Sequence, residues 1–420
     1  MKDKIIKYKF KKFNTIDKKE LLAVKKVLKS GVLSSFLGSK SKNFYGGKKV
    51  LEFEKKFRNY FGVKYAISVN SWTSGLVTII GAIGIEPGDE VILPTWTMSA
   101  CASAILNWNA IPVFVDIDKN TFCLDPALVK KKITNKTKAI LTVDLFGHPA
   151  NIAEIKKIIK NRNITLISDT AQAIGSIRAG NFTGTDTDIG GYSFNYHKHI
   201  HTGEGGMIVT NNKNFANRCL LIRNHGEAVI NSLNKNKIKN ILGYNFRLGE
   251  IESSIGIEQL KKLKKIVKNK QKIAQVLTDG LKNLTGLKVP LLSKGYTHSY
   301  YIYPMSIDKD KIKVSKFYIL KKLMQLGVQG LRGKYTCLHK LPMFQKKICY
   351  GKKNFPWILN PNKITYSKDM YPVAEYLQNT AFIGLDLCSY DFKLKDVKLI
   401  VMSFKKVWNS LESLGKIKIS

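Results

Sequence analysis

One lysine, Lys198, stands apart from the other lysines of the chain. It lies between Gly190 and Thr210, in the stretch GGYSFNYHKHIHTGEGGMIVT, among aromatic and histidine neighbours, whereas lysines elsewhere form surface-like clusters such as Lys261-Lys262. Partial burial would lower the pKa of this lysine and make its amine nucleophilic near neutral pH. A lysine that bonds to a carbonyl compound needs this property. Taken alone, however, the stretch favours an ordinary surface-loop lysine.

A polar turn at residues 70–76 is a candidate anion site. It follows a short β-rich run and precedes an apolar helical segment. Backbone N–H groups at a helix N-terminus, together with the hydroxyls of Ser71, Thr73 and Ser74, can hold an anion. The turn matches neither GxGxxG nor a Walker loop, so a dinucleotide or ATP phosphate is less favoured. Ordinary helix capping is the alternative.

An aspartate, Asp169, follows the apolar run 164–167, where a strand is expected to end. It can cap a helix, or it can be a buried carboxylate that holds a protonated ring nitrogen. Pyridoxal phosphate needs a lysine, an acid for its ring nitrogen and a phosphate cup, and the chain supplies cup, acid and lysine in that order. Ser193 could add a hydroxyl to the cup, and Trp96 is a candidate to stack on the ring.

A third polar element, Gly243 to Leu248, places Asn245 and Arg247 at alternate positions before a long lysine-rich helical stretch. Such a turn can contact an anion, or it can serve only as the start of the helix.

Alternating strands and short-turned helices from residue 65 to 169 predict a parallel, doubly wound sheet. Ligands bind at the carboxyl ends of such strands, where turn 70–76, Asp144 and Asp169 are expected. Strands are predicted at 65–69, 91–93, 111–117, 139–143, 164–167, 207–210 and 300–307, with one more ending at 192–194. Helices are predicted at 17–29, 50–60, 98–106, 152–159, 213–224, 249–284 and 315–326, in the segment before 83, from 125–126 onward and after 394.

The length of 420 residues predicts two domains, which we place at 1–265 and 266–420. The second contains the strand at 300–307, the last two predicted helices and an irregular region at 329–370. The long helix is expected to bridge the two domains.

The net charge of +40 raises the question of a polyanion partner. Only 7 of the 70 basic residues are arginine, and the lysines are scattered along the whole length. We therefore interpret them as a solvated surface and expect no nucleic-acid partner. The six cysteines form no CxxC pair, so reduced thiols and no metal site are expected. Neither a signal peptide nor a long apolar run is present, and we expect no membrane association and a cytoplasmic location.

At these residues the chain resembles the DegT/DnrJ/EryC1/StrS family of sugar aminotransferases, which are pyridoxal-phosphate enzymes of fold type I. The pattern SFxxxK…TGxGG is especially specific. The segments that carry the resemblance are FYGGKKVLEFE (44–54), VNSWTSGL (69–76), EPGDEVILPTWTMSA (86–100), IPVFVDID (111–118), DLFGHPANI (144–152), ISDTAQAIGS (167–176), SFNYHKHIHTGEGGMIVT (193–210) and GYNFRLGEIESSIGIEQL (243–260). The resemblance implies an α/β fold, with a large domain built on a mostly parallel seven-stranded sheet between helices and a smaller C-terminal α+β domain.

The resemblance also implies the role of each site residue. Lys198 would bond the cofactor and move protons, Asp169 would pair with the pyridine nitrogen, and Gln172 would lie near the ring hydroxyl. Trp96 would stack on the ring, and Trp72, Thr73, Ser74 and Ser193 would hold the phosphate. Many members have Gly-Thr where this chain has Trp72-Thr73, so Trp72 would bind through its backbone. Asn245 would reach the phosphate of the neighbouring subunit in a homodimer with shared active sites, and His339, Tyr335 and Arg247 are candidate substrate contacts.

The implied function is transfer of an amino group from glutamate to a nucleotide-linked keto-hexose, which makes an amino sugar for surface polysaccharide or glycan synthesis. One branch of the family has histidine in place of the lysine and acts as a dehydratase. Because Lys198 is present, transamination is preferred. The alternatives are a pyridoxal-phosphate-dependent sugar-nucleotide dehydratase and a non-catalytic regulatory or polyanion-binding protein. Whether His197, His199 and His201 tune the lysine or only pack around it stays open.

Overall fold

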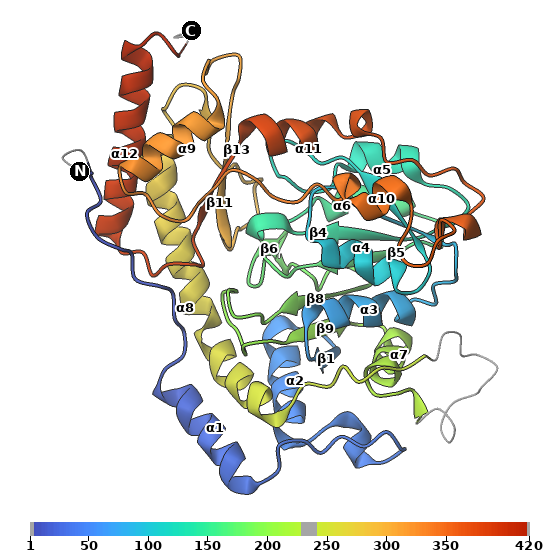
Figure 1. Ribbon diagram of the computed structural model, residues 1–420. Helices are drawn as coiled ribbons and strands as arrows, with labels where there is room; N and C mark the ends of the chain where they lie inside the picture. Colours follow the sequence, from blue (N-terminus) through green and yellow to red (C-terminus); the bar gives the residue numbers. More distant parts are fainter. Residues whose placement is uncertain (1–3, 228–241, 418–420) are drawn as a thin grey trace.

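The computed structural model describes residues 4–227 and 242–417 and contains two main sheets (Figure 1). The larger sheet has seven strands in the order β1-β9-β8-β5-β4-β2-β3, and the smaller has four in the order β10-β11-β13-β12. The strands of the larger sheet are β1 (Tyr65–Val69), β2 (Glu90–Pro94), β3 (Ile111–Val115), β4 (Thr137–Val143), β5 (Thr165–Asp169), β8 (Ile189–Ser193) and β9 (Gly206–Thr210). Those of the smaller sheet are β10 (Leu287–Lys288), β11 (Ile302–Ile307), β12 (Leu331–Arg332) and β13 (Phe382–Asp386), and β6 (Ile177–Arg178) pairs with β7 (Asn181–Phe182).

The large sheet is mostly parallel, as predicted. Strands β2, β3, β4, β5 and β8 pair in parallel, and β9 runs antiparallel to both β8 and β1. The ends of β1 and β8 therefore meet the start of β9, where Val69 and Ser193 both pair with Gly206. This edge gathers the polar residues that follow the strands, and the predicted fold class is confirmed.

Helices cover both faces of this sheet. They are α2 (Lys48–Phe61), α3 (Trp72–Ala82), α4 (Ser99–Leu106), α5 (Pro126–Lys132), α6 (Ile152–Ile159), α7 (Lys213–Arg223) and α8 (Glu250–Leu281), and α1 (Lys18–Ser30) packs on α8. In β9, Met207 and Val209 pack with Phe53 of α2, whereas Ile208 belongs to the other core cluster, with Leu76 of α3. Successive side chains of a strand point to opposite faces, so this strand fills two cores.

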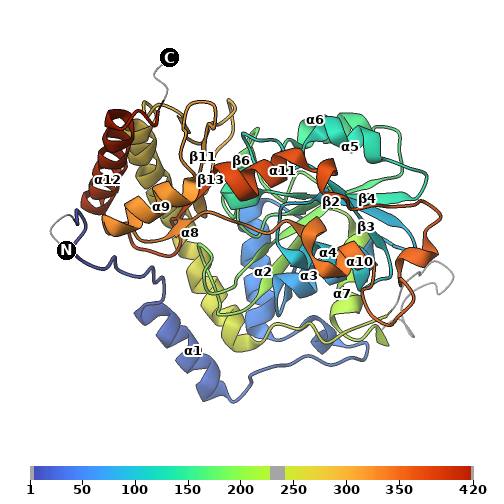
Figure 2. The ribbon, with the colours of Figure 1, turned by 45° about the horizontal axis from the view of Figure 1, so that its top comes forward.

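Helix α8 connects the large sheet with the smaller C-terminal part. It packs against α1 and α2 near its beginning and runs beside the C-terminal helix α12 (Leu394–Ser413), as both views show (Figures 1 and 2). The smaller part also holds α9 (Lys316–Gln325), while α10 (Pro342–Lys346) and α11 (Pro372–Tyr376) complete the helices of this region. The N-terminal segment also contacts this part, because the amides of Ile5 and Phe13 donate to the carbonyls of Leu326 and Ser389.

Most predicted elements occur within a few residues of their expected ends, but five strands of the described residues were missed, namely β6, β7, β10, β12 and β13. Strand β12 lies in the region 329–370, which was interpreted as irregular, and β13 follows it. Both are short, and β13 is buried along its whole length between β11 and β12. A short strand that is apolar on both faces carries no alternation that would reveal it. The boundary at residue 265 falls inside α8 and stays a proposal.

No helix among residues 4–227 and 242–417 is both long enough and apolar enough to cross a membrane.

Candidate active site

A cavity of about 760 Å³ lies at the carboxyl edge of the large sheet. Three parts of the chain line it. The large sheet contributes the turn after β1, the end of β5 and the β8–β9 connection. The smaller C-terminal part contributes Tyr301, Arg332, Tyr335 and Ser389, and the N-terminal segment contributes Lys12 and Phe13. The cavity is therefore bounded by segments that are distant in sequence.

Lys198 projects from the β8–β9 connection into this cavity. Its side chain is buried, and its Nζ lies 4.5 Å from the centre of the Tyr301 ring. Burial lowers the pKa of Lys198 to about 8, although the nearby carboxylate of Asp169 acts in the opposite direction. Near neutral pH a larger fraction of this amine is unprotonated than of an exposed lysine, which favours a nucleophilic role, and that role stays a prediction.

Asp169 ends β5 and also lines the cavity. Its Oδ1 accepts hydrogen bonds from the indole Nε1 of Trp72 at 2.7 Å and from the amide of Ala171 at 3.0 Å, and its Oδ2 accepts from the thiol of Cys101 at 3.1 Å. Burial raises the pKa of Asp169, while these donors and Lys198 favour its ionised form. The carboxylate is thus held in place by three donors beside a cationic lysine.

The polar turn after β1 becomes the first turn of α3. Ser71 is the N-cap residue, and its hydroxyl accepts from the amide of Ser74. The first amides of a helix have no intrahelical partner, and Ser71, Trp72 and Thr73 line the cavity at this point. This arrangement can bind an anion.

Ser74 lies outside the cavity lining in this structure, and its contact with a phosphate stays a prediction. Its hydroxyl pairs with that of Ser71 at 2.9 Å. Ser71 faces the cavity in its place. The side chain of Trp72 is turned towards Asp169, so only its backbone stays a predicted phosphate contact.

Three other predicted residues line the cavity, namely Gln172, Ser193 and Tyr335. Gln172 accepts from the amide of Phe146 and donates to the hydroxyl of Tyr335 at 2.7 Å, so both of its amide atoms are fixed. Ser193 lies at the end of β8, opposite the glycine that begins β9. Their roles toward a cofactor stay predictions.

The structure corrects the prediction for Trp96, which does not line the cavity. Its indole donates to Gln378 at 3.0 Å, and its ring packs among Phe122, Phe146 and Phe382. Met98, two residues further on, lines the cavity instead and is 56% exposed. The structure therefore places a flexible thioether side chain, and not the Trp96 indole, at the cavity wall.

His339 is also not a cavity residue in this structure. It is fully buried, and its two ring nitrogens contact Thr95 Oγ1 at 2.6 Å and Glu375 Oε1 at 2.8 Å. With both nitrogens engaged it ties the segment after β12 to the end of β2 and to α11. The prediction that His339 contacts a sugar nucleotide is thereby corrected.

Asn245 and Arg247 lie outside the cavity lining of this chain. The guanidinium Nε of Arg247 donates to Asn245 Oδ1 at 2.7 Å, and its Nη1 contacts Asn224. Asn245 is exposed. The contact that it is expected to make with a neighbouring subunit stays a prediction.

Sequence reasoning missed Lys12, Met98, Tyr301 and Arg332. Arg332 is one of only seven arginines in a chain whose basic residues are otherwise lysine, and this rarity is the one signal that could have singled it out. It pairs with Asp386 at 2.5 Å. Lys12 and Arg332, with Lys198, give the cavity three basic groups beside the carboxylates of Asp169 and Glu204.

The histidines around Lys198 have different surroundings. His199 is fully buried, its Nε2 lies 2.9 Å from the carbonyl of Ser299, and burial lowers its pKa to about 3. His197 lines the cavity, and burial together with Lys198 lowers its pKa to about 4. His201 is half-buried outside the cavity lining. His199 therefore packs as a neutral side chain, whereas His197 can face a ligand.

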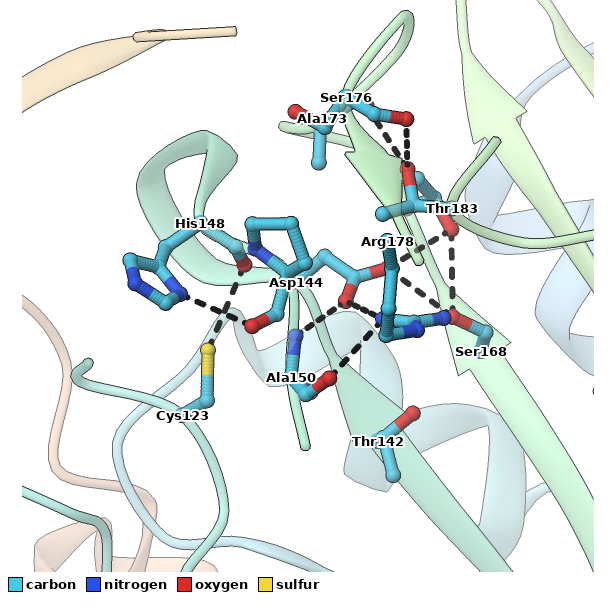
Figure 3. Close-up of polar contacts among 12 residues, drawn as sticks. Cys123, Thr142, Asp144, His148, Ala150, Ser168, Ala173, Ser176, Arg178 and Thr183 are labelled. Atoms are coloured by element: carbon cyan, nitrogen blue, oxygen red, sulfur yellow. Dashed lines mark hydrogen bonds and ion pairs between the residues drawn. The ribbon is translucent and has the colours of Figure 1, made fainter. Parts of the chain in front are cut away.

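A buried ionic network supports the edge of the sheet beside the site (Figure 3). Asp144 follows β4, and its Oδ1 accepts from Arg178 at 3.0 Å and from the amide of Ala150 at 2.7 Å. Its Oδ2 accepts from the hydroxyl of Ser168 in β5 at 3.0 Å. Arg178 also pairs with Asp186. These contacts fix the end of β4 beside the residue that precedes Asp169.

A buried lysine and a buried aspartate lie in one cavity at the carboxyl edge of a mostly parallel seven-stranded sheet, as the chemistry of a pyridoxal-phosphate enzyme of fold type I requires. The residues present fit the cofactor, because the cavity combines a reactive amine, a carboxylate for a ring nitrogen and an anion-binding helix N-terminus. Residues 14–366 match the model of the DegT/DnrJ/EryC1/StrS aminotransferase family. The chain belongs to this family, and its cofactor is pyridoxal 5'-phosphate.

Similar proteins include enzymes that make or modify nucleotide sugars. A GDP-perosamine synthase from Escherichia coli O157:H7 is 35% identical over 302 residues, which cover 72% of this chain and 80% of that protein. The structure of an aminotransferase from Psychrobacter cryohalolentis superposes with a TM-score of 0.81 at 26% identity and covers 96% of this chain and 100% of that one. The Escherichia coli GDP-4-keto-6-deoxy-D-mannose-3-dehydratase with bound hydrated pyridoxal phosphate gives 0.79 at 27% identity, over 94% and 99%. The family therefore includes more than one reaction.

Proposed function

We propose that this protein is an aminotransferase that moves an amino group from glutamate to a nucleotide-linked keto-hexose in the cytoplasm. The product would be an amino sugar for surface polysaccharide or glycan synthesis. The observation that carries the proposal is Lys198, a buried amine whose pKa is about 8, in the same cavity as the buried Asp169. The similarity to GDP-perosamine synthase supports a nucleotide sugar as substrate.

The helix N-terminus and the hydroxyls around it would hold the cofactor phosphate. Ser71 and Thr73 belong to the start of α3, and Ser193 ends β8 on the same edge of the sheet. A phosphate at this point is stabilised by the partial positive charge of the helix N-terminus and by free amides.

Lys198 and Asp169 would divide the proton chemistry between them. Pyridoxal phosphate, when bound, supplies an electron sink for negative charge on the reacting carbon. Asp169, ionised and held by its donors, would keep the proton on the ring nitrogen. The amine of Lys198, when it is not bonded to the cofactor, would take a proton from the α-carbon of the amino donor. In the second half-reaction it would deliver a proton to the sugar carbon that receives the nitrogen. A pKa near 8 suits a group that must both accept and release a proton near neutral pH.

Lys12 and Arg332 would bind the anionic parts of the substrates. Both line the cavity, and Arg332 is held by Asp386 at the end of β13. A guanidinium can bind a carboxylate or a phosphate through two parallel hydrogen bonds. Glutamate and a nucleotide diphosphate present these groups, so Lys12 and Arg332 suit both substrates.

A dehydratase on the same scaffold is the second candidate, because a solved dehydratase superposes over 94% of this chain. The lysine at position 198 favours transamination, since the dehydratase branch of the resembled family has histidine there. The two reactions differ in whether nitrogen from glutamate remains in the sugar.

The test supplies nitrogen-labelled glutamate and a panel of nucleotide-linked keto-sugars to the cofactor-loaded protein. We expect a labelled amino sugar in the product, release of 2-oxoglutarate in proportion, and loss of both in Lys198→Ala. A deoxygenated sugar without label would instead establish the dehydratase. Wild-type protein that gains no visible absorbance from pyridoxal phosphate would refute both.

We propose that two copies of the chain form the working enzyme. Several large apolar side chains of α1 and the segment after it are exposed, with Leu21 at 67%, Leu28 at 55% and Leu37 at 50%. An apolar surface of this kind on one side of a molecule is typical of an interface. Asn245 lies outside this chain's own cavity, which supports its predicted role in a partner's site.

A further inference from the structure

The indole of Trp72 has an unusual place for a residue at the start of an anion-binding helix. It is buried, with 6% of its surface exposed, and its N–H donates to Asp169 Oδ1 at 2.7 Å. The contact joins the first residue of α3 to the last residue of β5, 97 positions apart in sequence. A hydrogen bond to an ionised acceptor in a buried site is among the stronger polar contacts of a protein.

Glycines leave the space that this indole fills. A β-carbon on Gly75, one turn further along α3, would lie 2.7 Å from the Trp72 ring. A β-carbon on Gly191 in β8 would lie 2.4 Å from the ring and 2.1 Å from the carbonyl of Met207. Gly191 pairs with Asp169 in the sheet register, so the ring lies beside the strand that carries its acceptor. The chain therefore has a slot shaped for an aromatic ring next to Asp169.

The donors are distributed unequally over the two carboxylate oxygens of Asp169. Oδ1 accepts from both Trp72 and the amide of Ala171, whereas Oδ2 accepts from the thiol of Cys101, which is a weak donor. A carboxylate oxygen can accept about two hydrogen bonds. Oδ1 is thus saturated, and Oδ2 keeps acceptor capacity for one strong donor.

We propose that Trp72 is a positioning residue for Asp169, whose carboxylate it fixes so that Oδ2 faces the ring nitrogen of the cofactor. This inference rests on the proposed role of Asp169. In this proposal the side chain of Trp72 serves Asp169, and only the backbone amide of Trp72 is left to bind the phosphate. The N–H also favours the ionised carboxylate, because donors to the charged form stabilise it against the cost of burial.

Two variants separate the N–H of Trp72 from its ring. Trp72→Phe keeps an apolar ring in the slot and removes the donor, whereas Trp72→Gln keeps an N–H donor at similar reach and removes the ring. Trp108→Phe is the matched control, because the Trp108 indole is also buried, packs against Gly81 of α3 and donates to the neutral carbonyl of Val77 at 2.8 Å.

The main readout is the pH midpoint of the visible absorbance of the bound cofactor. In Trp72→Phe the ring nitrogen would lose its proton more readily, which removes a positive charge near Lys198 and moves the midpoint to higher pH. Cofactor binding should weaken roughly three- to tenfold. Trp72→Gln should keep a midpoint closer to wild type even if it is less stable, and Trp108→Phe should not move the midpoint. A midpoint unchanged in Trp72→Phe, or shifted more in Trp72→Gln, overturns the proposal.

A second measurement works on the protein without cofactor and stays valid if the proposed function fails. At acid pH, where Asp169 is protonated, the donor matters little. The loss of unfolding free energy in Trp72→Phe should therefore increase as the pH rises through the ionisation of Asp169, because the charge-assisted bond then forms only in wild type. The loss in Trp108→Phe should be the same at all pH values. Parallel pH profiles for the two variants would show that the indole only packs.

Discussion

The burial of Lys198 has a cost in stability as well as a benefit in chemistry. Its side chain is 7% exposed, and burial lowers the pKa of the amine to about 8 from an ordinary value of 10.5. Below pH 8 the folded chain without cofactor must hold a buried cation, and between pH 8 and 10.5 the folded state gives up this proton before the unfolded state does. The stability that Lys198 removes is therefore recovered as the pH rises through this window.

Replacing Lys198 by methionine should stabilise the cofactor-free protein at pH 7, by at most about 3 kcal/mol. The advantage of the variant over wild type should shrink as the pH rises from 8 towards 10.5. Urea unfolding of both proteins at several pH values measures the difference. A variant whose advantage does not depend on pH would show that the amine is not desolvated in the folded state.

At the scale of residues, the sequence correctly placed in the cavity the residues that directly follow a predicted strand. It misplaced residues whose side chains are held by partners elsewhere in the chain. Lys198, Asp169 and Gln172 follow strands that the pattern revealed, and all three line the cavity. Trp96 and His339 are withdrawn from it by contacts with Gln378 and with Glu375 and Thr95. These partners lie between 36 and 282 positions away and leave no trace in the local pattern.

At the scale of elements, the buried pair of Arg178 and Asp144 holds the carboxyl ends of β4 and β5 in register. The exposed fractions of the two side chains are 3% and 0%. Arg178 lies in β6, so its pair with Asp144 also anchors the short hairpin that follows β5 to the sheet (Figure 3).

We predict that Arg178→Met costs about 3–5 kcal/mol of unfolding free energy, because it leaves the Asp144 carboxylate buried without its cation. The matched control is Lys157→Met, which removes an exposed i,i+3 pair with Glu154 on α6 and should cost less than about 1 kcal/mol. Chemical denaturation of both variants measures the contrast. Equal costs would mean that the other donors to Asp144 compensate for the arginine.

The sequence predicted the large sheet better than the smaller part for a physical reason. Its strands lie between helices of regular apolar periodicity and end at polar turns, as at 65–69, where the predicted and observed bounds agree. In the smaller sheet, β13 pairs with both β11 and β12. These pairings between segments distant in sequence, and not a local pattern, define β12 and β13 as strands. The cavity residue Arg332 lies in β12, so sequence reasoning, which missed this strand, also missed the residue.

At the scale of the whole molecule, a shared active site makes a prediction about mixed subunits. Lys198→Ala and Asn245→Asp should each abolish or strongly reduce activity when pure. If Asn245 serves the partner's cavity, a heterodimer of the two variants contains one site with both native residues. Unfolding and refolding the mixture should restore up to about a quarter of wild-type activity per total site, by statistical pairing of subunits.

The control for this experiment is a mixture of the two variants that is never dissociated, which should stay inactive while subunit exchange is slow. Light scattering of wild type should give the mass of two chains. A refolded mixture without activity, or a monomeric mass, would contradict the shared site.

The strand order of the large sheet also determines when each segment can find its partner during synthesis on the ribosome. Strand β4 pairs with both β2 and β5, whereas β1 at residues 65–69 has β9 at residues 206–210 as its partner among the described residues. The segment 5–13 can form its hydrogen bonds only later, after residues 326 and 389 have been synthesised. The segment 5–13 thus leaves the ribosome long before the residues that fix it. Nascent chains that stop before residue 389 should leave it open to proteases, whereas strands β2–β5 can already be protected.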